Sequence, residues 1–454
     1  MLTEERDCIR RLAATKKRLF VVIRRSPEFF SCLKDFQKPE NAGLIAFVPE
    51  VVRPSMTEYI RSCFDLIVFY NQEKNTFYGV ENFDDVKIPD KDRFGDELLE
   101  IVRDRSKIEL LLTEESSNRE VARLGERLGV RCVGIQDVAR LHDKELMLAT
   151  VKQYGVPTAR SITLDLVEPF DTESVLKVMK EAVGGYPVFI RPTAMAGGCG
   201  TATIRNRRQM KRWLEDNKGK DKTCLIEEFI VGREFLAVVC LLEDGTFEPL
   251  VLRYLEYGKS YDMHIKTGDP LLIQVDTFEN VESAFPNMKS FVADAIDSLN
   301  PPRPHIFTIQ GFQRRPYSDE YVFVECSYRP AGGRTNSVCH KVCGVCQETA
   351  LLMSHMDPSY RPVVKSMKPN DEIYLWFPCQ DGLLEKYTEL PSKENISSGI
   401  TAKWQKPLGE LMKKATVINH QLLFMIVRND DPNQLLMDAK WIAANWKPIL
   451  KSTA

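Results

Sequence analysis

The sequence has almost no net charge, because 62 lysines and arginines stand against 64 aspartates and glutamates, giving a formal charge of −2. Without a global basic field, a chain is poorly suited to hold nucleic acid or an anionic membrane by electrostatic attraction. No apolar run is long enough to span a bilayer. The first residues, MLTEERDCIRRLAATKKRLFVV, lack the basic, apolar and small-residue order of a secretory signal. We therefore expect neither nucleic-acid binding nor membrane binding.

Three further absences narrow the class of protein. The twelve cysteines have no spacing typical of a disulfide framework, so we expect reduced thiols in a cytoplasmic protein. There is no repeat or low-complexity tract, and no Ser-His-Asp or Cys-His set for nucleophilic catalysis is apparent.

What is present is a globular composition, with 43% hydrophobic and 28% charged residues over 454 positions, a length that predicts two to four domains. Short runs rich in Val, Ile and Phe at 18–25 and 65–70 lie beside helix-like stretches and predict a βαβ arrangement. The segment 119–135 predicts a helix that ends at a glycine. A second helix is expected from Asp137 to Tyr154, and the first unit should end near residue 140.

The middle of the chain predicts an antiparallel or mixed sheet with helices between its strands. The run 235–257 contains an Asp-Gly turn between two β-rich segments, which is typical of a hairpin. After Pro304 we expect a strand, a turn at 315–320, a second strand, and helix to about Met356. The last ninety-odd residues predict a small β-rich unit closed by one amphipathic helix.

A glycine-rich loop follows one of the predicted strands in PVFIRPTAMAGGCGTATI. Glycines 197, 198 and 200 let backbone N–H groups turn toward a phosphate, and Arg191 can supply positive charge beside them. An ordinary glycine hairpin is the alternative, and the loop alone favours neither.

The stretch LIEEFIVGREF crowds three acids, Glu227, Glu228 and Glu234, close to apolar neighbours. Burying a carboxylate costs free energy unless a hydrogen-bond donor or a cation pairs with it. A ribose could supply hydroxyl donors, and the backbone from Glu227 to Ile230 could serve an adenine edge. An exposed acidic strand end is the alternative.

The stretch VFVECSYRPAGGRTN places an acid and two arginines at the end of an apolar strand. Glu325 and Ser327 are two residues apart and so project from one face, where they could meet Gln310 on the neighbouring strand. Oxygen donors of this kind suit Mg²⁺, which completes its shell with phosphates or waters.

Two other groups of residues have a mainly structural interpretation. Cys339, His340, Cys343 and Cys346 suggest zinc, but no paired knuckle accompanies them, and cysteines packing a helix are the favoured interpretation. Lys259 and Lys266 lie near His264, where either lysine could reach a phosphate, although solvated loop charge is favoured. Lys144, early on its helix, is by itself an ordinary solvated lysine.

The order of these pieces resembles the ATP-grasp superfamily, whose members activate a carboxylate as an acyl phosphate that an amine then attacks. A DK-containing helix before YGVPT, the basic-Pro-glycine loop, EEFIVGREF and VECSYRPAGG carry the resemblance, which covers most of the chain. The Arg-Pro-Ala-Gly-Gly ending is most similar to the amino-acid and dipeptide ligase branch, which includes carnosine synthase. It looks unlike a biotin- or purine-type carboxylating relative.

The resemblance implies an α/β (α+β) fold with three parts. These are a Rossmann-like pre-ATP-grasp domain over 1–139, an ATP-grasp domain over 140–358 with its lid at about 145–222, and a C-terminal β-rich unit with a closing helix over 359–454.

It also implies roles for individual residues. The expected nucleotide contacts are Lys144, Arg191, Ala196, Gly197, Gly198, Cys199, Gly200, Thr201, Glu227, Glu228, Phe229, Ile230 and Glu234. The expected metal ligands are Gln310, Glu325 and Ser327. Arg329 is expected to grip the reacting carboxylate or its phosphate, and Arg334 a second anionic end of the substrate.

The resemblance has three departures, at positions 191, 310 and 327, where the family usually has lysine, an acid and asparagine. Arginine keeps the charge and adds a fork of donors. Losing one acid from the metal shell should weaken Mg²⁺ binding.

The expected function is an ATP- and Mg²⁺-dependent ligase that forms an amide bond between a small carboxylate and an amine. The alternative is a catalytically inactive nucleotide-binding protein. The identity of both substrates, the use of Mn²⁺ and pairing into a homodimer stay open.

Overall fold

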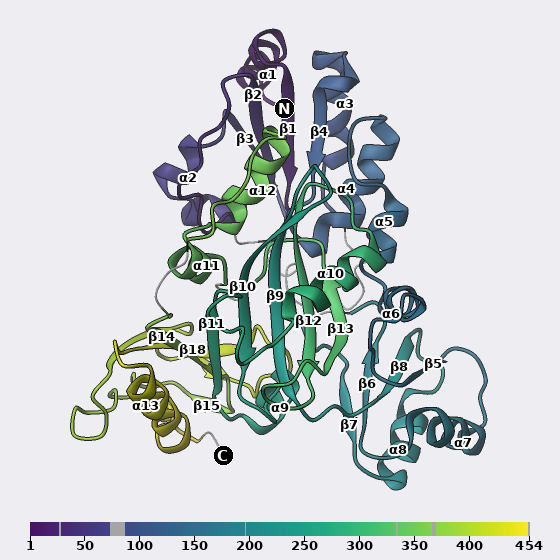
Figure 1. Cartoon of the computed structure of the whole chain (residues 1–454). Coiled ribbons are helices and arrows are strands. Elements are labelled where there is room, and N and C mark those ends of the chain that lie inside the picture. Colours follow the sequence, from purple (N-terminus) through teal and green to yellow (C-terminus); the bar gives the residue numbers. More distant parts are fainter. Residues whose placement is uncertain (27–28, 73–86, 196, 333–334, 366–368, 453–454) are drawn as a thin grey trace.

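The computed structural model describes residues 1–26, 29–72, 87–195, 197–332, 335–365 and 369–452. Within these ranges, three lobes surround a long central sheet, and the lobe built from the first residues lies at the top of the view (Figure 1). Each lobe has a hydrophobic cluster of its own, and a further cluster joins the N-terminal lobe to the central sheet.

The N-terminal lobe is a parallel sheet of strand order β3-β2-β1-β4 with helices around it. Every residue of β2 is buried, the continuous pattern expected of a parallel strand covered on both faces. The predicted βαβ arrangement is therefore confirmed. Its elements are α1 (Thr3–Thr15), β1 (Arg18–Ile23), β2 (Ala42–Pro49), η1 (Glu50–Ser55), α2 (Glu58–Ser62), β3 (Leu66–Tyr70), α3 (Lys91–Val102), η4 (Arg105–Lys107), β4 (Ile108–Leu111) and α4 (Glu115–Leu128).

The single helix expected from Asp137 to Tyr154 is wrong, because the structure has two helices, α5 (Ile135–Arg140) and α6 (Lys144–Gln153). Asp143 has an extended backbone, and its side chain accepts hydrogen bonds from the N–H groups of Glu145 and Leu146 at 2.9 and 3.0 Å. An aspartate in this N-cap position starts a new helix. As a result, Lys144 is the first residue of α6.

A small antiparallel sheet with two helices forms a second lobe, at the lower right of Figure 1. Its strand order is β5-β8-β6-β7. Its elements are β5 (Ser161–Asp165), α7 (Thr172–Val183), β6 (Val188–Pro192), β7 (Ala202–Ile204), α8 (Arg207–Asn217) and β8 (Thr223–Glu228). The glycine-rich loop connects β6 to β7.

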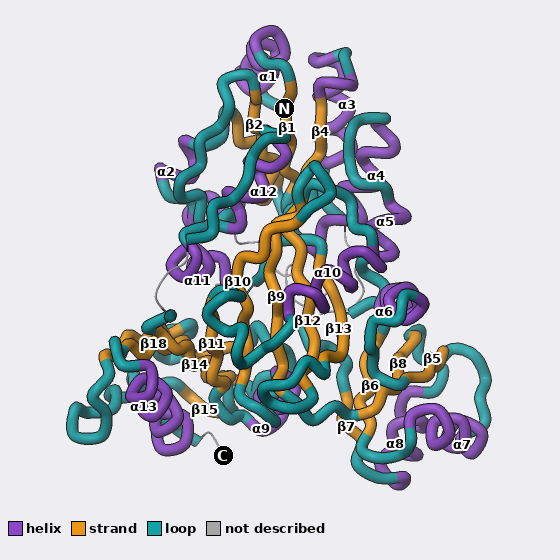
Figure 2. Tube along the Cα trace, in the orientation of Figure 1, coloured by secondary structure: helices purple, strands orange, loops and turns teal. Residues whose placement is uncertain are grey.

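The central sheet has eight strands in the order β13-β12-β9-β10-β11-β14-β18-β16. Its strands β9, β12 and β13 run through the middle of the molecule, in orange in Figure 2. The Asp-Gly hairpin is confirmed as the β9–β10 turn. Alternate residues of β9 face opposite sides: Phe235 and Ala237 pack in the cluster that includes α10, and Leu236 and Val238 pack in the cluster that includes α11. The elements are β9 (Arg233–Leu241), β10 (Phe247–Leu255), α9 (Tyr261–Thr267), β11 (Leu271–Asp276), α10 (Met288–Leu299), β12 (His305–Gln313), β13 (Tyr321–Ser327), α11 (Thr335–Cys343) and α12 (Gln347–Met356).

The predicted C-terminal unit is rich in strands and contains one helix, α13 (Pro432–Asn445), that packs on them. Three of its strands, β14 (Glu372–Pro378), β16 (Gly399–Trp404) and β18 (Gln421–Arg428), extend the central sheet, because β14 pairs with β11. A separate pair, β15 (Gly382–Leu383) and β17 (Leu411–Met412), lies outside that sheet. The C-terminal strands are thus continuous with the central sheet, and the domain boundaries stay a prediction.

The twelve cysteines all have free thiols. Among the described residues, no helix combines the length and the hydropathy needed to cross a membrane.

Candidate active site

One row of residues crosses the central sheet and carries the candidate metal ligands. The strand register pairs Glu325 with Gln310, and Gln310 with Leu236 on β9. Side chains that are paired across neighbouring strands project from the same face. The expectation that Glu325 meets Gln310 is therefore confirmed. Ser327 pairs with Thr308 two residues along the same strand.

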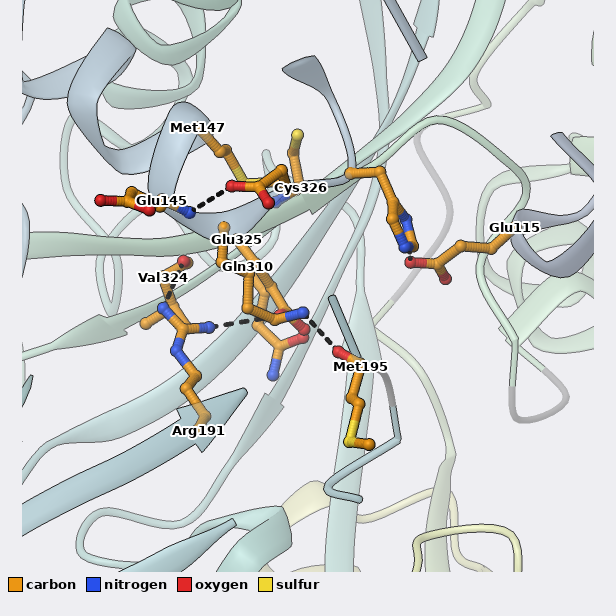
Figure 3. Close-up of polar contacts among 12 residues, drawn as sticks. Glu115, Glu145, Met147, Arg191, Met195, Gln310, Val324, Glu325 and Cys326 are labelled. Carbon is orange, nitrogen blue, oxygen red and sulfur yellow. Dashed lines mark hydrogen bonds and ion pairs between the residues drawn. The ribbon is translucent and has the colours of Figure 1, made fainter. Parts of the chain in front are cut away.

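Arg191, at the end of β6, joins the small sheet to this row (Figure 3). Its Nε and Nη2 donate to the two carboxylate oxygens of Glu227 at 2.6 and 3.1 Å. Nη2 also donates to the Val324 carbonyl at 3.0 Å, and Nη1 to Glu325 Oε2 at 3.3 Å. Arg191 and Glu227 are only 5% and 4% exposed, so they form a buried ion pair.

Lys144 reaches the same carboxylate from the start of α6. Its Nζ lies 3.7 Å from Glu325 Oε2 and donates to the Met195 carbonyl. Lys144 is buried, whereas Glu325 keeps about a third of its side chain exposed. The two basic positions implied by the resemblance are thus together, on either side of one partly exposed acid.

The glycine loop has the conformation that its composition predicts. Gly197, Gly198 and Gly200 have φ values of +66°, +77° and +70°, a region that favours glycine. The Gly197 carbonyl accepts from the Ile418 N–H at 3.1 Å, and Thr201 Oγ1 donates to Asp262 Oδ1 at 3.0 Å. The loop therefore rests on α9 and on the turn that precedes β18. Cys199 is part of it and is half-buried.

The three acids at the end of β8 and the start of β9 have partners within the chain. Glu227 and Glu234 are buried, so the alternative of an exposed acidic strand end is wrong for these two. Glu228 forms ion pairs with Arg160 and Arg314. Its N–H donates to the Arg160 carbonyl, and the Phe229 N–H donates to the Pro187 carbonyl at 3.3 Å. Ile230 follows directly after these engaged N–H groups.

Glu234 is buried beside Gln310, one of the candidate metal ligands. Its carboxylate accepts from Gln310 Nε2 at 2.5 Å and from the Tyr261 N–H at 3.0 Å. Burial raises the pKa of Glu234 to about 7, and these two donors only partly oppose the shift. Because Gln310 uses Nε2 for this contact, its carbonyl oxygen is the atom left to accept a cation.

Arg329 contacts an acid of the N-terminal lobe. Its Nε and Nη2 donate to Glu115 Oε2 at 2.9 and 2.8 Å. Glu115 Oε1 lies 3.5 Å from His142 Nδ1. Burial alone raises the pKa of Glu115, but Arg329 and His142 hold that pKa well below its usual range. Sequence reasoning missed Glu115 and His142, although Glu115 follows the buried strand β4, at the carboxyl edge where ligands of parallel sheets gather.

The remaining candidates lie elsewhere or beyond the described ranges. Ala196 and Arg334 lie outside the described residues. Cys339 and Cys343 are fully buried in the core, as expected for packing, and the His340 ring contacts Asp35. His264 is buried within α9, and Lys266 pairs with Asp262 at 2.7 Å.

Comparison with known proteins shows which families and folds the chain is similar to. Residues 150–287 match the family model described as D-ala D-ala ligase C-terminus. The chain is 23% identical over 145 residues to D-alanine–D-alanine ligase B of Clostridium perfringens, which is 31% of this chain and 45% of that protein. The match thus spans less than half of that relative's length.

Two solved structures resemble nearly the whole chain. The L-amino acid ligase from Bacillus licheniformis has a TM-score of 0.64 at 11% identity, covering 96% of this chain and all of that one. The biotin carboxylase domain of the Hydrogenobacter thermophilus 2-oxoglutarate carboxylase, in complex with MgADP, has a TM-score of 0.56 at 17% identity, covering 91% and 86%. The chain therefore has the ATP-grasp fold, and the resemblance seen in its motifs is confirmed.

Proposed function

We propose that the protein is an ATP- and Mg²⁺-dependent ligase that joins a small-molecule carboxylate to an amine and releases ADP and phosphate. The observation that carries the proposal is the convergence of Lys144 and Arg191 on the partly exposed carboxylate of Glu325. The relatives reported above are ligases and a carboxylase by name. An inactive nucleotide-binding protein finds no support in them.

The three candidate metal ligands fit a magnesium ion that is bound mainly through nucleotide phosphates. Glu325 supplies one carboxylate, and Gln310 and Ser327 supply neutral oxygens. Mg²⁺ in nucleotide sites is commonly held by one or two carboxylates together with phosphates and waters. When bound, such an ion neutralises charge on the transferring phosphoryl group.

The charges of the site explain how a triphosphate could be accepted. Two cations, Lys144 and Arg191, face two carboxylates, Glu227 and Glu325, so this group of four has no net charge. Glu325 is the more exposed acid and the one with the longer contacts, at 3.3 and 3.7 Å. A cation that takes over Glu325 leaves Lys144 and part of the Arg191 fork for an anion. Nucleotide binding is therefore expected to open the contacts of Glu325 and to keep the Arg191–Glu227 pair.

Arg329 is proposed to hold the reacting carboxylate and the acyl phosphate formed from it. Its guanidinium stabilises negative charge that develops during phosphoryl transfer. Glu115 orients this guanidinium through two contacts to Nε and Nη2, and among the described residues Nη1 donates only to the neighbouring Pro330 carbonyl at 2.9 Å. The nucleophile is the amine of the second substrate, so no nucleophilic side chain is needed.

The test measures ADP formed from ATP and Mg²⁺ with pooled small carboxylates and pooled amines, added separately and together. We expect ADP above background only when both pools are present. Glu325→Gln and Arg329→Gln should abolish this ADP, and Arg315→Gln, at the exposed tip of the same hairpin, should not. Nucleotide that raises the melting temperature without substrate-dependent ADP from any pool would refute the ligase proposal.

Pairing into a homodimer stays a prediction. The Hydrogenobacter neighbour is described as a domain dimer. Light scattering on the purified protein measures the oligomeric state directly.

A further inference from the structure

A cavity of about 200 Å³ lies on the same face of the central sheet as Glu325, outside the nucleotide residues discussed above. It is bounded by β10, β11, β14, β18 and α11. An engineered cavity of about 150 Å³ accepts benzene, and drug-sized ligands need roughly 300 Å³ or more. The cavity is therefore of a size for one amino acid and too small for a nucleotide.

The apolar part of the wall comes largely from the C-terminal strands. Tyr374, Trp376 and Phe424 line the cavity, and the rings of Trp376 and Phe424 meet edge to face at 5.4 Å between centroids. Ile273 and Val275 of β11 complete this side. Such a wall is suited to an apolar or aromatic side chain.

The charged part of the wall is positive. Lys341 and Arg428 both bind Glu372, which also accepts a hydrogen bond from the Tyr374 hydroxyl. Lys341 pairs in addition with Asp371 at 2.8 Å. These two acids balance the two cations. The third cation of the wall, Arg253, lies over the Tyr261 ring, 5.3 Å from its centroid, and favours the charged form of the buried Glu234 carboxyl without a direct ion pair to it.

Arg253 has the character of an anion-binding residue. It is only 9% exposed, and no carboxylate in the described part of the chain lies within ion-pair distance of it. Its Nη1 donates to Thr335 Oγ1 at 2.7 Å and to the Gly332 carbonyl at 3.4 Å, whereas its Nε is buried without a hydrogen-bond partner. A buried guanidinium with an unused donor is costly, and a carboxylate with two oxygens is its best-matched partner.

The cavity is next to the place where Arg329 is proposed to hold the reacting carboxylate. Arg253 pairs with Leu236 across the sheet and so extends the row of Glu325 and Gln310. Strands are about 4.8 Å apart, so the backbones of Arg253 and Glu325 are about 14 Å apart. Gly332 lies between the two arginines, because its carbonyl accepts from Arg253 and a methyl group on it would come within 3.7 Å of Arg329 Nη1.

We propose that this cavity binds the second substrate, an amino acid whose carboxylate pairs with Arg253 and whose apolar or aromatic side chain packs on Tyr374, Trp376 and Phe424. The identification of this ligand as the substrate that supplies the amine rests on the ligase activity proposed above. Binding of the amino acid itself does not depend on that activity.

The test measures the fluorescence of Trp376, taken as the difference between the protein and its Trp376→Phe variant. The common amino acids are titrated one at a time without nucleotide, and phenethylamine and 3-phenylpropionate are titrated beside phenylalanine. We expect saturable binding of one or more apolar or aromatic amino acids. For the preferred amino acid, removal of its carboxylate should weaken binding roughly tenfold or more, the usual effect of losing a charge-assisted hydrogen bond.

Two substitutions test the role of charge. Arg253→Gln should weaken binding of the preferred amino acid by roughly tenfold or more. Because Arg253 is buried, a second variant at the exposed rim avoids doubts about folding. Ser337 lines the cavity and is exposed, so Ser337→Glu should weaken amino-acid binding, and Ser337→Gln, its uncharged control, should not.

Absence of Trp376-dependent binding for every amino acid would overturn the proposal, as would equal binding to Ser337→Glu and Ser337→Gln. If the ligase is active, Ser337→Glu should raise the KM for the amine substrate and leave the KM for the carboxylate substrate unchanged. An active ligase whose amine KM is unaffected refutes the cavity assignment alone. Amino-acid binding without ADP formation from any pool refutes the ligase proposal alone.

Discussion

Replacement of Arg191 by methionine tests whether this arginine, at a position where the family resemblance implies lysine, is held in place by a buried acid. The structure gives Arg191 two hydrogen bonds to Glu227, one to the Val324 carbonyl, and a longer contact to Glu325. Removing one partner of a buried ion pair typically costs about 3–5 kcal/mol, because the other charge stays buried without compensation. We expect Arg191→Met to lower the free energy of unfolding by that amount. Glu325 adds little to this cost because it is partly exposed.

The double variant Arg191→Met with Glu227→Leu separates the ion pair from other effects of the substitution. Buried pairs replaced by apolar residues of similar volume are often neutral in stability. The double variant should therefore regain most of the loss, while nucleotide binding remains absent because the cation is missing. Arg191→Lys should be intermediate in stability, since lysine keeps the charge but not the fork of donors.

The measurement is urea denaturation followed by tryptophan fluorescence, with ADP and Mg²⁺ added in a parallel series. A single variant within about 1 kcal/mol of the wild type would refute the buried ion pair, because a buried unpaired carboxylate costs more than that. A double variant no more stable than the single one would show that Glu227 is not the residue left uncompensated.

Three further outcomes are expected from urea denaturation. Burial raises the pKa of Glu234 from 4.5 to about 7. The free energy of unfolding of the wild type should therefore fall by about 3 kcal/mol as the pH rises between these values, and that of Glu234→Gln should not. Parallel pH profiles of the two proteins would contradict this expectation. Glu115 has a lowered pKa, so Glu115→Gln should lose about 1–3 kcal/mol at pH 7, and the difference should narrow as the pH falls below 4.5. Gly200→Ala would place a methyl group 2.9 Å from Pro192 at a φ of +70°. It should lower the free energy of unfolding by more than its control Gly219→Ala, which has a φ of +76° but no atom within 4 Å of the added methyl group. Equal losses of stability would exclude the contact with Pro192 as the cause.

Local patterns predicted much of the fold because their causes lie within a few residues of sequence. The Asp-Gly turn formed the β9–β10 hairpin, and the glycines after Arg191 adopted positive φ. Glu325 lies opposite Gln310 beside a register shift between β12 and β13, which alternation along one strand does not predict. The helix from Asp137 to Tyr154 was wrong because an aspartate side chain that caps a new helix, Asp143, competes locally with helix continuation.

The sequence by itself determined the order of the motifs, the residue types at each position and hence the ATP-grasp class of fold. Only the tertiary structure decided which charges neutralise one another. Glu227 meets Arg191 across 36 positions and Arg329 meets Glu115 across 214, separations at which no periodicity of the chain carries information. The Arg253 cavity likewise exists only because β14 and β18 join a sheet begun more than a hundred residues earlier, which brings aromatic rings against a buried guanidinium.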